Sequence, residues 1–162
     1  MSGTKDGELT ALQAALAAEH AAVYGYGVVG GRIEEARHTE AQAAYDAHRA
    51  RRDALVRELR DADAEPVAAS AGYALPFPVT DSAAAVRLAV RLEERVAGVY
   101  SDLVRAATGR HRATAAEALR ESAVRAARWR GGSVAFPGLA ERSEATGSAG
   151  APSASTSAAP TG

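Results

Sequence analysis

The chain has 162 residues, a formal net charge of −1 and no cysteine. The balanced charge disfavours nucleic-acid binding, and the absence of cysteine excludes disulfide frameworks, thiolate catalysis and cysteine-ligated zinc. No segment reaches the roughly 18 consecutive apolar residues of a membrane span, and residues 1–8 lack the apolar run of a signal peptide. We therefore expect a cytoplasmic protein with neither a nucleic-acid nor a membrane partner.

The first predicted helix runs from Glu8 to about Arg32, after a disordered amino terminus at residues 1–7. Its apolar positions alternate spacings of three and four, as in a helix packed in a bundle, and they are Leu9, Leu12, Leu16, Val23 and Tyr26. Glu19 falls in the same series, so a carboxylate lies on the face predicted to be buried. A buried carboxylate needs a metal, a cationic side chain or trapped water as its partner.

A second helix is predicted from about Thr39 to Asp63, antiparallel to the first because the connection is short. Its inward face is predicted to contain Ala41, Tyr45, His48, Arg52, Leu55, Leu59 and Ala62. Residues 64–80 contain three prolines, so we expect this segment to be the long connection of the molecule.

The third helix is predicted to begin at a cap formed by residues 80–82 and to continue to about Ala107. Glu93 lies inside its apolar face, whereas Glu94 falls on its polar face.

The fourth helix is expected from about Arg112 to Arg130, with a stop at two glycines. Its predicted inward residues are Ala116, Leu119, Ala123 and Ala126. Residues 134–139 offer Phe136 and Leu139 as a strap over the end of the bundle, and residues 143–162 are expected to form a disordered tail. The folded domain would thus cover residues 8–142.

Two helices, a long crossover and two more helices make an all-α, up-down four-helix bundle of the ferritin-like arrangement. Proteins of this kind hold two metal ions with one Glu from each of two helices and a Glu-x-x-His from each of the others. Glu19, Glu93 and His48 match this pattern, but Tyr45 stands where a glutamate is expected. On the fourth helix, Glu121 has no histidine three residues later. The chain therefore keeps at most four of the six metal ligands of the ferritin-like pattern.

Several sequence segments resemble those of a known family, and they lie at residues 19–27, 47–53, 73–79, 92–96 and 126–130. In these segments the chain resembles a ferritin-like family of unknown function found in actinobacteria, over about residues 9 to 140. The resemblance implies the fold and hardly any activity.

Two functional hypotheses follow. In the first, which we favour, the chain is a non-catalytic binding or structural module whose alanine- and glycine-rich faces offer a surface for a homodimer. Its closed ionic core would contain Glu19, Tyr45, His48, Arg52 and Glu93, since Arg52 lies one turn from His48 and a guanidinium can pair with an inward carboxylate.

In the second hypothesis, the chain is a metal-dependent oxidoreductase. Its ligands would be Glu19, His48, Glu93 and Glu121, and this donor set suits iron or manganese.

Overall fold

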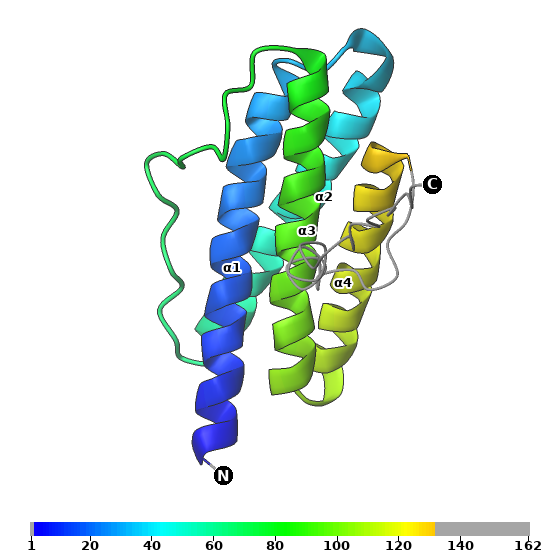
Figure 1. The fold of residues 1–162 in the computed structure, drawn as a ribbon. Coiled ribbons are helices and arrows are strands. Elements are labelled where there is room, and N and C mark those ends of the chain that lie inside the picture. Colours follow the sequence, from blue (N-terminus) through cyan, green and yellow to red (C-terminus); the bar gives the residue numbers. More distant parts are fainter. Residues whose placement is uncertain (1, 132–162) are drawn as a thin grey trace, which may run out of the picture.

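Four long helices and one short 3-10 helix make up the secondary structure that the computed structural model describes, over residues 2–131 (Figure 1). The elements in chain order are α1 (Ser2–Gly30), η1 (Glu35–Arg37), α2 (His38–Asp61), α3 (Ser82–Ala106) and α4 (Gly109–Arg130). Within this range there is no β-strand. The structure is therefore all-α, and it agrees with a four-helix bundle.

The long crossover fixes the directions of the helices. Residues 62–81 return the chain along α1 to the end of the molecule where α2 began, so α3 runs in the same direction as α2 (Figure 1). Gln13 holds this crossover, because its side-chain amide donates to the Glu65 carbonyl at 2.6 Å and accepts from the Val67 amide at 2.8 Å. α1 packs against α2 and α3, and α3 packs against α4.

The helix ends follow from local chemistry. Asp81 caps α3, as its carboxylate accepts the Ala84 amide at 2.7 Å. α4 ends at Gly131, whose φ of 80° is the left-handed conformation that glycine adopts without strain. α1 begins at Ser2, however, so the predicted disorder of residues 1–7 is wrong from Ser2 onward. A polar segment without a proline can extend a helix that is already nucleated, because each added residue gains a hydrogen bond.

The buried face of α4 also differs from the prediction. The buried residues are Ala115, Ala118, Ser122, Ala126 and Trp129, a register shifted from the predicted Ala116, Leu119 and Ala123. Alanine occurs on every side of this helix, so its apolar pattern does not distinguish one face from another. The predicted strap at residues 134–139 and the predicted tail at residues 143–162 lie outside the described residues.

The apolar core has two clusters with a polar layer between them. One cluster contains Leu12, Leu16, Leu55, Leu59, Val96 and Leu103, and the other contains Val29, Ile33, Ala44, Leu88 and Trp129. Along each of α1, α2 and α3, one ionisable residue lies near the boundary between the two sets. These residues are Glu19, His48 and Glu93, and all three are fully buried. No helix within residues 2–131 is long and apolar enough to cross a membrane.

Candidate functional site

Three helices each contribute one ionisable side chain to the middle of the bundle. His48 of α2 lies between the two carboxylates, with Nδ1 2.6 Å from Oε2 of Glu19 and Nε2 3.1 Å from Oε1 of Glu93. All three side chains have zero exposure to solvent. The geometry therefore uses both nitrogens of the imidazole, each directed at one carboxylate.

Two tyrosines complete the hydrogen bonding of these carboxylates. Tyr100 donates to Oε1 of Glu19 at 2.7 Å, and Tyr26 donates to Oε1 of Glu93 at 2.7 Å. The indole of Trp129 in turn donates to the Tyr26 hydroxyl at 3.0 Å, which links α4 to the network. Burial raises the pKa of both phenols above their usual range, so both remain protonated donors.

The network holds His48 in its protonated form. Burial alone lowers the pKa of this imidazole, but hydrogen bonds and charge from Glu19 and Glu93 outweigh burial and raise the pKa to about 9. For Glu93, burial raises the pKa, while the hydrogen bond and charge of His48, the Tyr26 hydroxyl and the Arg125 charge lower it below the usual range. An imidazolium between two carboxylates is thus the stable state at neutral pH.

Arg125 of α4 supplies a second positive charge. Its Nη1 lies 4.0 Å from Oε2 of Glu93, and neither of these buried atoms has a hydrogen-bond partner within the described part of the chain. Its Nη2 lies 3.4 Å from Oε2 of Glu121. With Arg125, two positive groups face the two buried carboxylates, so formal charge in the core is balanced.

The structure places Arg52 outside this core, contrary to the prediction. Its Nε and Nη2 lie 2.9 Å and 2.7 Å from Oδ1 of Asp53, and the side chain is 27% exposed. A residue four positions after His48 shares its helix face, but a long flexible guanidinium can turn to solvent and to a neighbouring carboxylate. Arg125, on a helix whose register the sequence did not define, occupies the expected cationic position near Glu93.

Tyr45 and Glu121 also lie at the periphery. Tyr45 is partly buried against an apolar cluster, with the Arg49 guanidinium 5.7 Å from its ring centre, and it makes no hydrogen bond to the core. Glu121 pairs with Arg51, and its side chain is 38% exposed. Of the predicted site residues, the structure brings together Glu19, His48 and Glu93. The additional members are Tyr26, Tyr100, Arg125 and Trp129.

The donor set does not fit a metal ion in this arrangement. An imidazole that donates a proton from each nitrogen has no lone pair left for a metal. Across residues 2–131, no three side chains of the ligand-forming types His, Asp and Glu are arranged to hold a metal ion. The residues present are arranged as a buried ionic network.

These features define an all-α protein of four helices with a buried Glu–His–Glu network. The chain belongs to the family described as a domain of unknown function, DUF4439, whose model matches residues 11–141. It is similar to the crystal structure of a conserved hypothetical protein, rv2844, from Mycobacterium tuberculosis, an actinobacterium. The two are 40% identical with a TM-score of 0.75, over 77% of this chain and 96% of the other. No curated protein matches the chain.

Proposed function

We propose that this chain is a non-catalytic member of the ferritin-like bundles, a binding or structural module in which a closed ionic core takes the place of a metal centre. The single observation that carries this proposal is the position of His48, whose two ring nitrogens each face a buried carboxylate. The two helix pairs and the long crossover between α2 and α3 support the ferritin-like assignment.

The ionic core would fix the relative positions of α1, α2 and α3. Removing one partner of a buried ion pair leaves an uncompensated charge and typically costs about 3–5 kcal/mol. A shift of one helix along another would likewise separate Glu19 or Glu93 from His48. The core therefore favours one register of the bundle over its alternatives.

Metal content tests this proposal. The full chain is produced in cells supplemented with iron and manganese, purified without chelator and analysed for metals, beside a Glu19→Ala, Glu93→Ala variant and a Glu94→Ala control. We expect less than a tenth of an equivalent of metal in all three, and a melting temperature of the unaltered chain that a chelator leaves unchanged. One equivalent or more of metal in the unaltered chain and the control, lost in the double variant, would overturn the proposal.

A second candidate is an iron- or manganese-binding oxidoreductase that uses Glu19, His48, Glu93 and Glu121. The observation in its favour is Oε2 of Glu93, a buried carboxylate oxygen without a hydrogen-bond partner within the described part of the chain. For this function His48 must first release a proton, and Glu121 must leave Arg51. The same metal analysis distinguishes the two candidates.

The proposed module acts in the cytoplasm and binds neither nucleic acid nor membrane, in line with its near-zero formal charge of −1. We expect it to form a homodimer through small-residue helix faces. Light scattering of the eluted full chain measures this directly: a monomer mass at all concentrations from micromolar to millimolar would exclude the dimer.

A further inference from the structure

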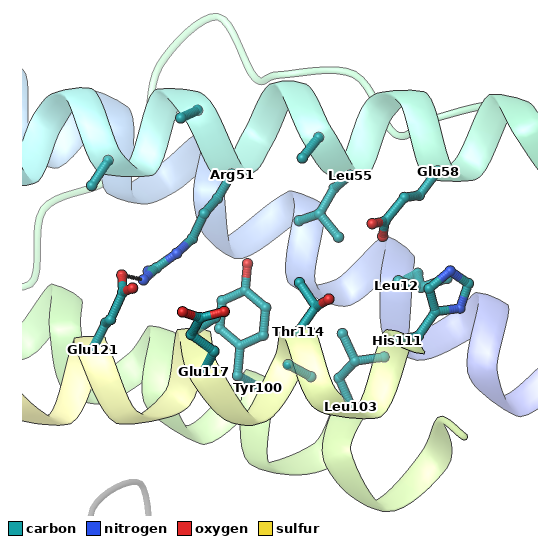
Figure 2. Close-up of a pocket in the computed structure, with 15 residues that line it drawn as sticks. Leu12, Arg51, Leu55, Glu58, Tyr100, Leu103, His111, Thr114, Glu117 and Glu121 are labelled. Atoms are coloured by element: carbon teal, nitrogen blue, oxygen red, sulfur yellow. Dashed lines mark hydrogen bonds and ion pairs between the residues drawn. The ribbon is translucent and has the colours of Figure 1, made fainter. Parts of the chain in front are cut away.

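A cavity lies between α2 and α4, and it borders the ionic core at Tyr100 (Figure 2). Its volume is about 360 Å³, within the range of small-molecule sites of about 300–1,000 Å³. The facing sides of both helices carry alanines, which are Ala47, Ala50 and Ala54 on α2 and Ala115 and Ala118 on α4. Because these side chains end at Cβ, they leave space between the two helices.

The floor of this cavity is apolar. Leu12 of α1, Leu55 of α2 and Leu103 of α3 line it, together with Tyr100 (Figure 2). The hydroxyl of Tyr100 is directed to Glu19, so the cavity meets the aromatic ring rather than a free polar group. Such a surface suits the hydrocarbon part of a ligand.

The charged residues of the cavity leave an excess of negative charge. Arg51 is paired with Glu121, and His111 Nδ1 lies 2.5 Å from Oε1 of Glu8. Glu58 and Glu117 also line the cavity, one from each helix, and the carboxylate of neither has a hydrogen bond or ion pair to another residue between 2 and 131. Both carboxylates point into the space between the helices (Figure 2). An anionic ligand would be repelled here, and a cation attracted.

We propose that this cavity binds a small organic amine, with its hydrocarbon body on the apolar floor and its ammonium group attracted by the negative charge of Glu58 and Glu117. The inference gives a ligand class to the binding role proposed above and so rests on that role. Glu19, His48 and Glu93 do not line the cavity, and Tyr100 is the residue that the cavity shares with the ionic core.

Three eight-carbon probes test the charge requirement on the full chain. Octylamine, octanol and octanoate share the hydrocarbon body and differ in charge at neutral pH. Binding is measured by calorimetry and by the amide chemical shifts of the isotope-labelled protein. We expect octylamine to bind at least tenfold more tightly than octanol and octanoate, with shifts at residues 47–58 and 111–121. Equal binding of all three probes, no binding of octylamine, or shifts confined to other residues would overturn the proposal.

Paired variants test the residues. The Glu58→Gln, Glu117→Gln variant should weaken octylamine binding at least tenfold, and Ala54→Leu, which fills the cavity, should abolish it. The matched control is Glu34→Gln, Glu35→Gln, which removes two exposed carboxylates at the connection between α1 and α2 and should leave affinity unchanged. Thermal unfolding of each variant verifies that it is folded. Unchanged affinity in the Glu58→Gln, Glu117→Gln variant overturns the proposal.

The alternative occupant of the cavity is a segment of the chain itself, residues 134–139. A full-length Phe136→Ala, Leu139→Ala variant is therefore tested with the same probes. Octylamine affinity equal to that of the unaltered chain supports the amine site. Binding that occurs only in this variant would assign the cavity to residues 134–139 and overturn the proposal. Because the metal analysis concerns Glu19 and Glu93, failure of the amine site and failure of the ionic core are separate results.

Discussion

His48 Nδ1 lies 2.6 Å from Oε2 of Glu19, and solvent reaches neither side chain. Two ionisable groups withdrawn from water lose their hydration, and only close, well-directed contacts offset that loss. Glu19 has such contacts on both oxygens, because Tyr100 donates to the other one at 2.7 Å. The stability of the bundle should therefore depend on this pair far more than on its surface ion pairs.

Replacement of Glu19 tests this dependence. Glu19→Ala leaves Nδ1 of His48 and the Tyr100 hydroxyl without their acceptor, and we expect a loss of about 3–5 kcal/mol in the free energy of unfolding. Urea denaturation monitored by circular dichroism measures it. The control is Glu94→Ala, which removes the ion pair to the partly exposed Arg130 and should cost about 1 kcal/mol or less. Equal losses in the two variants would contradict the ionic core.

The pH dependence of stability tests the charge on His48. Its pKa is about 9 in the folded chain, against an ordinary value of 6.5. Above pH 6.5 the folded chain keeps a proton that the unfolded chain releases. The contribution of His48 is thus fully present below about pH 6.5 and is lost as the pH rises through about 9. A shift of this size corresponds to on the order of 3 kcal/mol.

Urea denaturation at pH 6, 7.5, 9 and 10 should show this loss, and His48→Gln should show a flatter profile. The pKa of His48 can also be followed directly through its ring resonances in the unaltered chain, which keeps the test valid if the variant does not fold. A midpoint near 6.5 would mean that the imidazole gains no proton affinity from its two carboxylates.

Arg125 and Arg52 allow a comparison between an arginine that faces the buried core and one that lies outside it. Arg125 faces buried Glu93 with 20% of its side chain exposed, whereas Arg52 pairs with its neighbour Asp53. We expect Arg125→Met to cost about 1–3 kcal/mol, because the buried carboxylate of Glu93 loses the positive charge that faces its Oε2. Arg52→Met should cost about 1 kcal/mol or less, as for exposed ion pairs. Chemical denaturation of both variants measures the two losses in the free energy of unfolding. A larger loss for Arg52→Met would support the sequence-based prediction that Arg52 is the cation of the core.

Glu19, His48 and Glu93 could be identified from the sequence because each interrupts an apolar series on its own helix. Arg125 and Ser122 could not, since α4 has alanine and arginine around its whole circumference and its apolar pattern does not define a buried face. Arg52 is predicted to lie in the core because it is one turn from His48, but its guanidinium pairs with Asp53 instead. Periodicity predicts the helix face on which the Cα of an arginine lies. It does not predict which of several nearby carboxylates the long side chain contacts. The cavity between α2 and α4 depends on the distance between these two helices, and the sequence pattern does not predict that distance.

Gly25 tests the packing that brings α1 and α3 together. A Cβ at this position would lie 2.5 Å from Cδ1 and 2.8 Å from Cδ2 of Leu92 on α3. In a helix, Gly→Ala alone gains about 1 kcal/mol of intrinsic propensity, but overpacking costs about 1–3 kcal/mol. We expect Gly25→Ala to destabilise the chain by about 1 kcal/mol, as measured by urea denaturation.

The sign of this effect should depend on Leu92. In a Leu92→Ala background the methyl groups are gone, so Gly25→Ala should stabilise the chain by up to about 1 kcal/mol through helix propensity alone. Gly27→Ala is the matched control in the same helix, because a Cβ there meets no atom within 4 Å. It should stabilise the unaltered chain by a similar amount. If Gly25→Ala and Gly27→Ala stabilise equally when Leu92 is present, α1 and α3 can separate without penalty, and close contact at Gly25 does not limit their approach.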